Sequence, residues 1–136
     1  QVTRNWMDEL RWLEYAQRLT LRRRNVGAAP GAGEPSTAAR LFNRALPAGA
    51  RAAGQACWGL EIGARADALV LDLQAPGMLG MPPEQALDAL IFATDASAMG
   101  TVYVAGQAVV ERGRHIAGPR IAARFKDTMA ELWSET

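Results

Sequence analysis

Apolar side chains near the start of the chain recur every three or four residues, which is the spacing of one face of an α-helix. Asn5 precedes this run and suits an N-cap, because its side chain can accept a bond from a free backbone N–H. The pattern predicts a helix over residues 6–24, with Arg22, Arg23 and Arg24 favourable at its C-terminal end. Trp12 and Tyr15 widen the apolar stripe, so we expect this helix to contact two neighbours. The positions expected to be buried are Met7, Leu10, Leu13, Ala16 and Leu19.

A second helical pattern follows the segment 26–34, which is rich in Gly, Ala and Pro and is expected to be a loop with nothing to pack. Ser36 is the expected N-cap of this helix. Pro47 is expected to stop or kink it, since proline lacks the N–H and clashes with the preceding turn, and a short helical piece resumes over residues 48–53. The expected buried side consists of Leu41, Phe42 and Ala45.

From residue 54 onward the pattern changes to short apolar runs separated by turns. The run 68–71, introduced by a turn at 63–65, predicts a covered strand. A helix is expected after Pro82 and Pro83. Two further strands, 101–104 and 107–110, are joined by Ala105-Gly106 and predict a hairpin. The expected inner face of the helix consists of Ala86, Leu87, Leu90 and Ile91.

The last predicted helix, residues 118–133, presents Ile121, Phe125, Met129 and Leu132 at spacings of three and four. This stripe needs a surface to cover it. About three predicted strands cannot close a barrel or form a two-sheet sandwich, and small open sheets are marginal without further strands or a helix cover. The pattern therefore indicates that the chain lacks some of its packing partners.

Composition narrows the function classes. The chain has 136 residues, 49% of them hydrophobic, and a net charge of +1, so it gives no electrostatic preference for nucleic acid or anionic lipid. The three consecutive arginines that begin at Arg22 could bind phosphate, but the near-zero net charge and the lack of interleaved aromatic residues favour a solvated helix end. No run reaches the roughly 18 apolar residues of a membrane span, and no signal-peptide core is present. We expect a cytoplasmic protein with neither a nucleic-acid nor a membrane partner.

Residues that carry chemistry are sparse. Cys57 is the only cysteine, which excludes an internal disulfide, and it is expected to be a small buried hydrophobe. His115 is the only histidine and cannot form a zinc site alone; we expect it to be exposed. Asp67 and Asp72 have no acid, base or nucleophile near them in sequence, so we interpret them as structural. We expect no catalytic residue and no metal-binding residue in this chain, and its substrate-binding residues are unknown.

Three blocks carry a resemblance to a known family. They are DELRWLEYAQRLTLRRRN at 8–25, GLEIGARADALVLDL at 59–73, and the hairpin region 102–113. Together they resemble the formimidoylglutamate deiminases of the amidohydrolase superfamily. The resemblance implies an α/β fold that is a C-terminal fragment of a metal-dependent (β/α)8 barrel: residues 1–55 would be the last helical unit of the barrel. Residues 56–136 would be the C-terminal strands of the small composite β-sandwich domain, with an interspersed helix and a terminal helix.

The resemblance also implies an activity for the full-length enzyme, namely hydrolysis of the formimino C–N bond of N-formimino-L-glutamate to N-formyl-L-glutamate and ammonia in histidine degradation. It implies one divalent metal, usually zinc, held upstream of this chain and not by it. Gln1, Val2, Thr3 and Arg4 would lie nearest the pocket mouth. The implied partners are the missing N-terminal barrel portion, a small-molecule substrate and a second copy in a homodimer, and this fragment alone would be inactive.

Two alternatives remain open from the sequence. One is another amidohydrolase deaminase with a different substrate. The other is a non-catalytic α/β interaction module that acts through its exposed apolar faces. A stand-alone module would be monodisperse and unfold cooperatively, whereas an amputated piece would aggregate or have a molten core.

Overall fold

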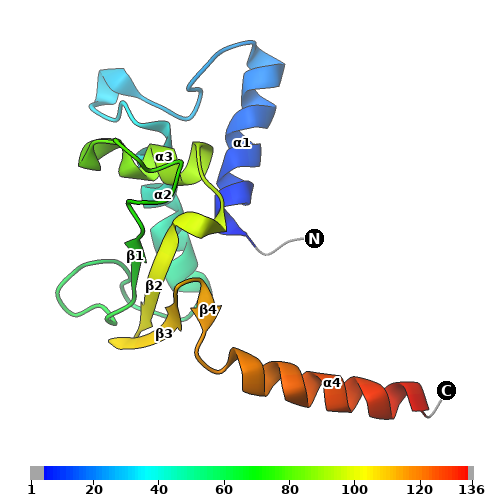
Figure 1. Cartoon of the computed structure of the whole chain (residues 1–136). Coiled ribbons are helices and arrows are strands. Elements are labelled where there is room, and N and C mark those ends of the chain that lie inside the picture. The colour runs from blue at the N-terminus through cyan, green and yellow to red at the C-terminus, as the bar shows by residue number, and fades with distance from the viewer. Residues whose placement is uncertain (1–4, 135–136) are drawn as a thin grey trace.

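The computed structural model describes residues 5–134 and consists of helices and one antiparallel sheet (Figure 1). The mixed α/β character expected from the sequence is confirmed. The α-helices are α1 (Trp6–Leu21), α2 (Thr37–Ala52), α3 (Ala86–Phe92) and α4 (Gly118–Ser134). The strands are β1 (Ala68–Leu71), β2 (Met99–Val104), β3 (Gln107–Glu111) and β4 (Arg114–His115). Three short 3-10 helices are η1 (Pro30–Ala32), η2 (Pro83–Gln85) and η3 (Ala96–Ala98).

Helix α1 begins as predicted but ends earlier. The Asn5 side chain accepts a hydrogen bond from the Met7 N–H at 3.1 Å, which confirms the cap. The predicted end at residue 24 is wrong, because the helix stops at Leu21 and Arg22 adopts a left-handed conformation with φ 51°. This early stop turns the chain back toward α1, whereas a continued helix would carry residues 26 and 27 away from it.

The buried face of α1 also differs from the prediction. Only Met7 and Glu14 are buried, while Leu13 and Leu19 are 52% and 80% exposed. Leu10 is half-buried and Ala16 is exposed. The reason is that α2 and α3 lie against the side of α1 that carries Met7 and Glu14, and nothing in the described residues covers the apolar side.

Helix α2 has its predicted cap, since the Ser36 hydroxyl accepts a bond from the Ala39 N–H. The predicted break at Pro47 is wrong, because α2 continues to Ala52 as one helix. Pro47 and Asn43, four residues before it, are both exposed, so water can bond the carbonyl that lacks its helical N–H. Leu41 and Phe42 are only half-buried and Ala45 is exposed; the buried residues of α2 are Thr37, Ala38 and Ala50.

The four strands form one open sheet in the order β1-β2-β3-β4, with every neighbouring pair antiparallel. Strand β1 and the β2–β3 hairpin are confirmed, with Leu69 opposite Val102 and Val104 opposite Gln107. In the hairpin turn both Ala105 and Gly106 have positive φ, as a two-residue type I′ turn requires. The estimate of about three strands missed the two-residue β4, which is too short to show a period of two.

The core lies where α1, α3 and the start of the sheet meet. Asp88 of α3 accepts bonds from the Ser36 hydroxyl and the Ala38 N–H, which fixes α3 against the N-terminal end of α2. The core therefore joins elements from both parts of the division 1–55 and 56–136, and that boundary stays a prediction. The buried core residues are Met7, Ala75, Met78, Ala89, Leu90 and Ala98.

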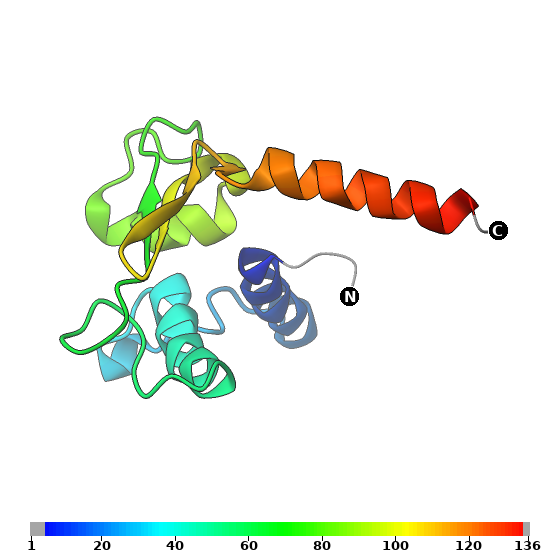
Figure 2. The ribbon, with the colours of Figure 1, turned by 90° about the horizontal axis from the view of Figure 1, so that it is seen from below.

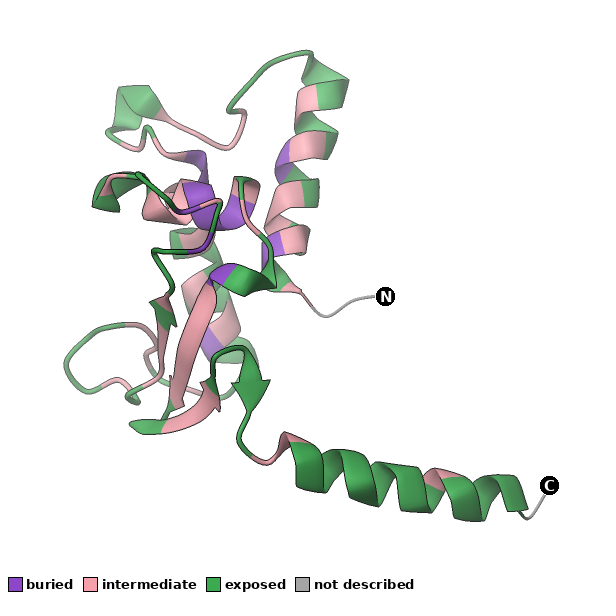
Figure 3. Ribbon diagram, in the orientation of Figure 1, coloured by how far each residue is buried: buried purple, intermediate pink, exposed green. Residues whose placement is uncertain are grey.

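Helix α4 extends away from all of these elements, and two perpendicular views agree on this (Figures 1 and 2). None of its residues is buried, and it is exposed along almost its whole length (Figure 3). The helix itself was predicted, as was its apolar stripe. What the described residues do not supply is the surface that this stripe would cover.

Candidate functional site

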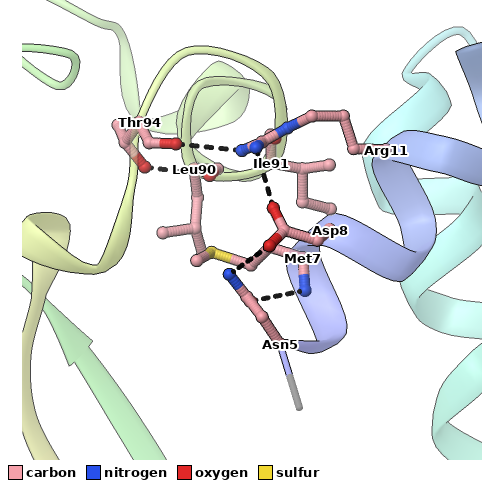
Figure 4. A network of polar contacts seen from close by, with 7 residues as sticks. All are labelled: Asn5, Met7, Asp8, Arg11, Leu90, Ile91 and Thr94. Carbon is pink, nitrogen blue, oxygen red and sulfur yellow. Dashed lines mark hydrogen bonds and ion pairs between the residues drawn. The ribbon is translucent and has the colours of Figure 1, made fainter. Parts of the chain in front are cut away.

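Arg11 joins the start of α1 to the end of α3 through an array of polar contacts (Figure 4). Its guanidinium donates to the Ile91 carbonyl at 2.7 Å and to the Thr94 carbonyl at 2.9 Å. Asp8 accepts from Arg11 at 2.9 Å and from the Asn5 amide at 3.0 Å. A cation at the C-terminal end of α3 also interacts favourably with the helix dipole. This arrangement fixes α1 against α3, immediately after residues 1–4.

Glu14 is the one buried carboxylate of the described residues, with 1% of its surface exposed. Its oxygens accept from the Val26 N–H at 3.0 Å, the Gly27 N–H at 2.8 Å and the Arg18 guanidinium at 2.8 Å. The Arg40 guanidinium donates to the Gly27 carbonyl at 2.8 Å from the other side. The expectation that the 26–34 loop packs against nothing is therefore wrong, because its first residues are anchored to α1 and α2.

Asp67 anchors the hairpin at the entrance to β1, as the structural interpretation predicted. It accepts from the Ala105 N–H at 2.9 Å and from the Arg65 guanidinium at 2.6 Å. The Arg65 bond, followed by the Ala105 N–H, holds the pKa of Asp67 below its ordinary value, and Asp67 in turn raises the pKa of Arg65. Asp72 lies beyond the other end of β1 and accepts from the Gln74 N–H at 2.9 Å, so the two carboxylates are not brought together as a pair.

Asp95 plays a similar local part at the start of η3. Its carboxylate accepts from the Ser97 N–H at 2.8 Å and caps this short helix. Hydrogen bonds from Ser97 hold the pKa of Asp95 below its ordinary value. Such a cap stabilises a turn and gives no sign of acid or base chemistry.

The remaining candidate residues do not assemble into a reactive site. His115 is exposed on β4, as expected, and its Nδ1 accepts from the Ala117 N–H at 3.1 Å. Cys57 is half-buried, not buried, and no sequence neighbour provides a base. Between residues 5 and 134 there is no group of three His, Cys, Asp or Glu side chains able to hold a metal. The described residues thus do not fit the zinc that the resemblance implies for the full-length enzyme.

A shallow hollow of about 400 Å³ lies where β1 ends, beside η3 and the β3–β4 turn. It is lined in part by Asp72, Ser97, Thr101 and Arg112. It holds one carboxylate and one guanidinium and no nucleophile with an adjacent base, so the hollow lacks the arrangement that catalysis needs.

Sequence reasoning missed Arg11 and Glu14 as positioning residues. The available signal was the spacing of Asp8 to Arg11 and of Glu14 to Arg18, which places opposite charges on the helix side that also carries Met7. Arg22, Arg23 and Arg24 are exposed and lie beyond the end of α1. Gln1, Val2, Thr3 and Arg4, expected near a pocket mouth, lie outside the described residues.

Comparison with known proteins gives a consistent picture. No family model matches the chain. The chain is 38% identical over 131 residues to a formimidoylglutamate deiminase of Pseudomonas aeruginosa, a match that covers 96% of this chain and 28% of that protein. Among solved structures it matches an amidohydrolase from Brucella melitensis with a TM-score of 0.79 and 37% identity, over 97% of this chain and 28% of that one.

The chain thus spans little more than a quarter of the length of the proteins it matches. None of the helices between residues 5 and 134 has the length and apolar character that a membrane span requires. The resemblance found in the sequence is confirmed: over nearly its whole length this chain is similar to a formimidoylglutamate deiminase, and its fold matches part of a solved amidohydrolase.

Proposed function

We propose that this chain is the C-terminal part of an amidohydrolase that hydrolyses the formimino C–N bond of N-formimino-L-glutamate, giving N-formyl-L-glutamate and ammonia. The observation that carries the proposal is the 38% identity to the Pseudomonas aeruginosa deiminase across 96% of the chain. In this assignment α1 and α2 are helices of the last barrel unit. The sheet and α4 belong to the small β-sandwich domain.

Uncovered apolar surface supports this placement. On α1 the side chains of Trp12, Leu13 and Leu19 are exposed, although Leu13 and Leu19 belong to the stripe whose spacing predicts a buried helix face. Large exposed apolar surfaces on a soluble domain usually mark contacts with another surface. A barrel wall supplied by the rest of the enzyme would cover this side of α1 while leaving the contacts of Met7 and Glu14 intact.

The reacting groups are proposed to lie outside this chain. Amidohydrolases are commonly metal-dependent, yet the described residues offer no ligand set, so no step of the reaction is assigned to them. The part proposed for this chain is to support the barrel through the Arg11 and Glu14 anchors. By itself the chain is expected neither to release ammonia nor to retain zinc after dialysis.

A chimera tests the assignment. The segment of the Pseudomonas aeruginosa relative that matches this chain is replaced by residues 1–136, and ammonia release from N-formimino-L-glutamate is measured. We expect activity in the chimera and none in the relative with the segment deleted. A chimera that is folded and monodisperse but releases no ammonia would contradict the proposal that this chain serves as the C-terminal part.

The substrate is tested separately, since the chimera takes its active-site residues from the relative. The coding DNA upstream of the Gln1 codon is sequenced for an in-frame extension that carries a His-x-His pair and an Asp shortly before Gln1. The complete product is then assayed with N-formimino-L-glutamate and with other amidine substrates. Preference for another substrate would favour the different deaminase, and a stop codon directly upstream would favour the non-catalytic module.

A further inference from the structure

The link between β4 and α4 is two residues long, and both of its backbone N–H groups have an acceptor. The Ile116 N–H donates to the Val109 carbonyl at 2.9 Å, which continues the pairing of β4 with β3. The Ala117 N–H donates to the ring Nδ1 of His115 at 3.1 Å. The Ala117 carbonyl then accepts from the Ile121 N–H at 3.0 Å, which opens α4. His115 therefore holds the residue from which the helix starts.

Packing does little to fix the direction of α4. None of its residues is buried, and Figures 1 and 2 show it leading away from the sheet directly after the link. Pro119 lies in its first turn, where the fixed φ of proline suits the start of a helix. The helix is thus stiff from its beginning, so a change in its direction has to occur at Ile116 and Ala117.

Protonation of His115 removes the acceptor at this link. A ring nitrogen accepts a hydrogen bond only in the neutral imidazole, whereas both ring nitrogens of the charged form are donors. Histidine is the side chain whose charge ordinarily changes between about pH 5 and pH 8. A positive ring would also lie beside the N-terminal end of α4, where the helix dipole disfavours a cation. Both effects have the same sign: the bond forms at the higher pH and is lost as the pH falls.

The charged groups around His115 do not replace the lost bond. Those on β3, the β3–β4 turn, β4 and the first turn of α4 are Glu111, Arg112, Arg114 and Arg120. The one carboxylate among them, Glu111, lies opposite Arg114 in the ladder, and His115 lies opposite the uncharged Val110. Because neighbouring side chains alternate between the faces of a sheet, Glu111 and His115 lie on opposite faces. The charged ring therefore gains no ion pair across the ladder.

We propose that His115 is a pH-sensitive hinge between the sheet and α4. In the neutral state its ring holds the Ala117 N–H and, with it, the direction of the helix. In the protonated state the link keeps the bond of Ile116 to β3, and α4 samples a wider range of directions. Acidification thus changes where the apolar stripe that includes Phe125 is presented relative to the sheet. The hinge goes beyond the proposed enzymatic function and does not depend on it.

Amide NMR of the full chain between about pH 8 and pH 5 tests the loss of the bond. We expect the Ala117 amide resonance to shift in step with the ring protons of His115. The protection of this amide from exchange, corrected for the intrinsic rate, should fall about fivefold, because an exposed hydrogen bond and a cation at a helix end each contribute little free energy. The Ile116 amide is the internal control, since its acceptor does not titrate, and it should keep its protection.

Pulsed EPR measures the direction of α4 between spin labels at the exposed positions Gln17→Cys and Ala130→Cys, in a Cys57→Ala background. The distance distribution should be narrow at the higher pH and broader at the lower one. His115→Asn retains a side-chain acceptor for the N–H two residues later but cannot titrate, so its distribution should be narrow at both pH values. His115→Leu lacks the acceptor, and its distribution should be broad at both.

The amide resonances of α1 and α3 report whether each variant is folded, and the unchanged protein and His115→Asn decide the test even where His115→Leu does not fold. The proposal is overturned if the protection of Ala117 and the distance distribution stay constant across this pH range. It is also overturned if His115→Asn responds to pH as the unchanged protein does, because another group would then be responsible. A narrow distribution in a folded His115→Leu would contradict it equally.

Discussion

Glu14 offers the sharpest test of how this part of the fold is held together. Replacement of Glu14 by alanine removes both carboxylate oxygens and leaves the Val26 and Gly27 N–H groups without their acceptor. It also removes the 2.8 Å ion pair with Arg18. The loop from Val26 would then be held by Arg40, which donates to the Gly27 carbonyl and forms an ion pair with Glu34.

The expected cost follows from the burial of each group. An unsatisfied backbone N–H costs about 1–3 kcal/mol, and the lower value applies here because Val26 and Gly27 are half-buried and water can reach them in part. The Arg18 side chain is 33% exposed, so its ion pair contributes less than a fully buried one. With the packing lost at Glu14, we expect Glu14→Ala to lower the free energy of unfolding by about 3 kcal/mol.

Urea unfolding followed by tryptophan fluorescence measures this cost. With a slope of about 2 kcal/mol per molar urea, the midpoint should fall by about 1.5 M. Glu14→Gln retains one acceptor oxygen and should cost about half as much. Gln17→Ala, at an exposed position of the same helix, should change stability by less than about 0.5 kcal/mol. A loss in Glu14→Ala no larger than that in Gln17→Ala, with unchanged amide exchange at Gly27, would refute the anchoring role.

Three further changes test the close approaches and charges of the fold. Gly77→Ala should lower the free energy of unfolding, measured in urea, by about 1–3 kcal/mol, because the new Cβ would lie 2.4 Å from the Ala93 carbonyl oxygen. In the control Gly31→Ala the new Cβ meets no atom within 4 Å, so stability should not change. Leu90→Ala removes a side chain that is 1% exposed and should cost about 2–5 kcal/mol in the same assay. The pKa of Asp67 is lowered in the folded protein, so the ionised carboxylate stabilises the fold above the ordinary pKa of 3.8 and this stabilisation is lost as the pH falls through the folded-state pKa. The urea midpoint of the unchanged protein should therefore fall as the pH is lowered from 5. In Asp67→Asn the midpoint should fall less steeply.

Local signals in the sequence predicted most elements and several of their boundaries. The caps at Asn5 and Ser36 were predicted correctly, since a side-chain acceptor at a helix start acts over two or three residues and needs no distant partner. The turn at Ala105-Gly106 was predicted for the same reason. Pro47 shows the limit of such rules, because its cost depends on whether water reaches the freed carbonyl, and that is a tertiary property.

Long-range contacts were the part that local patterns could not supply. Arg11 bonds to carbonyls 80 and 83 residues away, and nothing near it in sequence specifies those acceptors. Glu14 is buried because backbone N–H groups 12 and 13 residues later turn back onto it. A carboxylate on a helix is normally assigned to the solvent side, so its burial required knowledge of the loop path.

The errors in predicted burial have a common physical origin. A hydrophobic period reflects everything that a helix contacts in its final assembly, whereas exposure in this structure reflects only contacts within residues 5–134. On α3 the burial predicted from the hydrophobic period agrees with the observed burial of Leu90 and Ile91, because their partners all belong to the chain. On α1 they disagree at Leu13 and Leu19, and on α4 they disagree along the stripe that includes Phe125. The disagreement therefore identifies two surfaces, one on α1 and one on α4, where the apolar spacing of the sequence is not matched by contacts within the described residues.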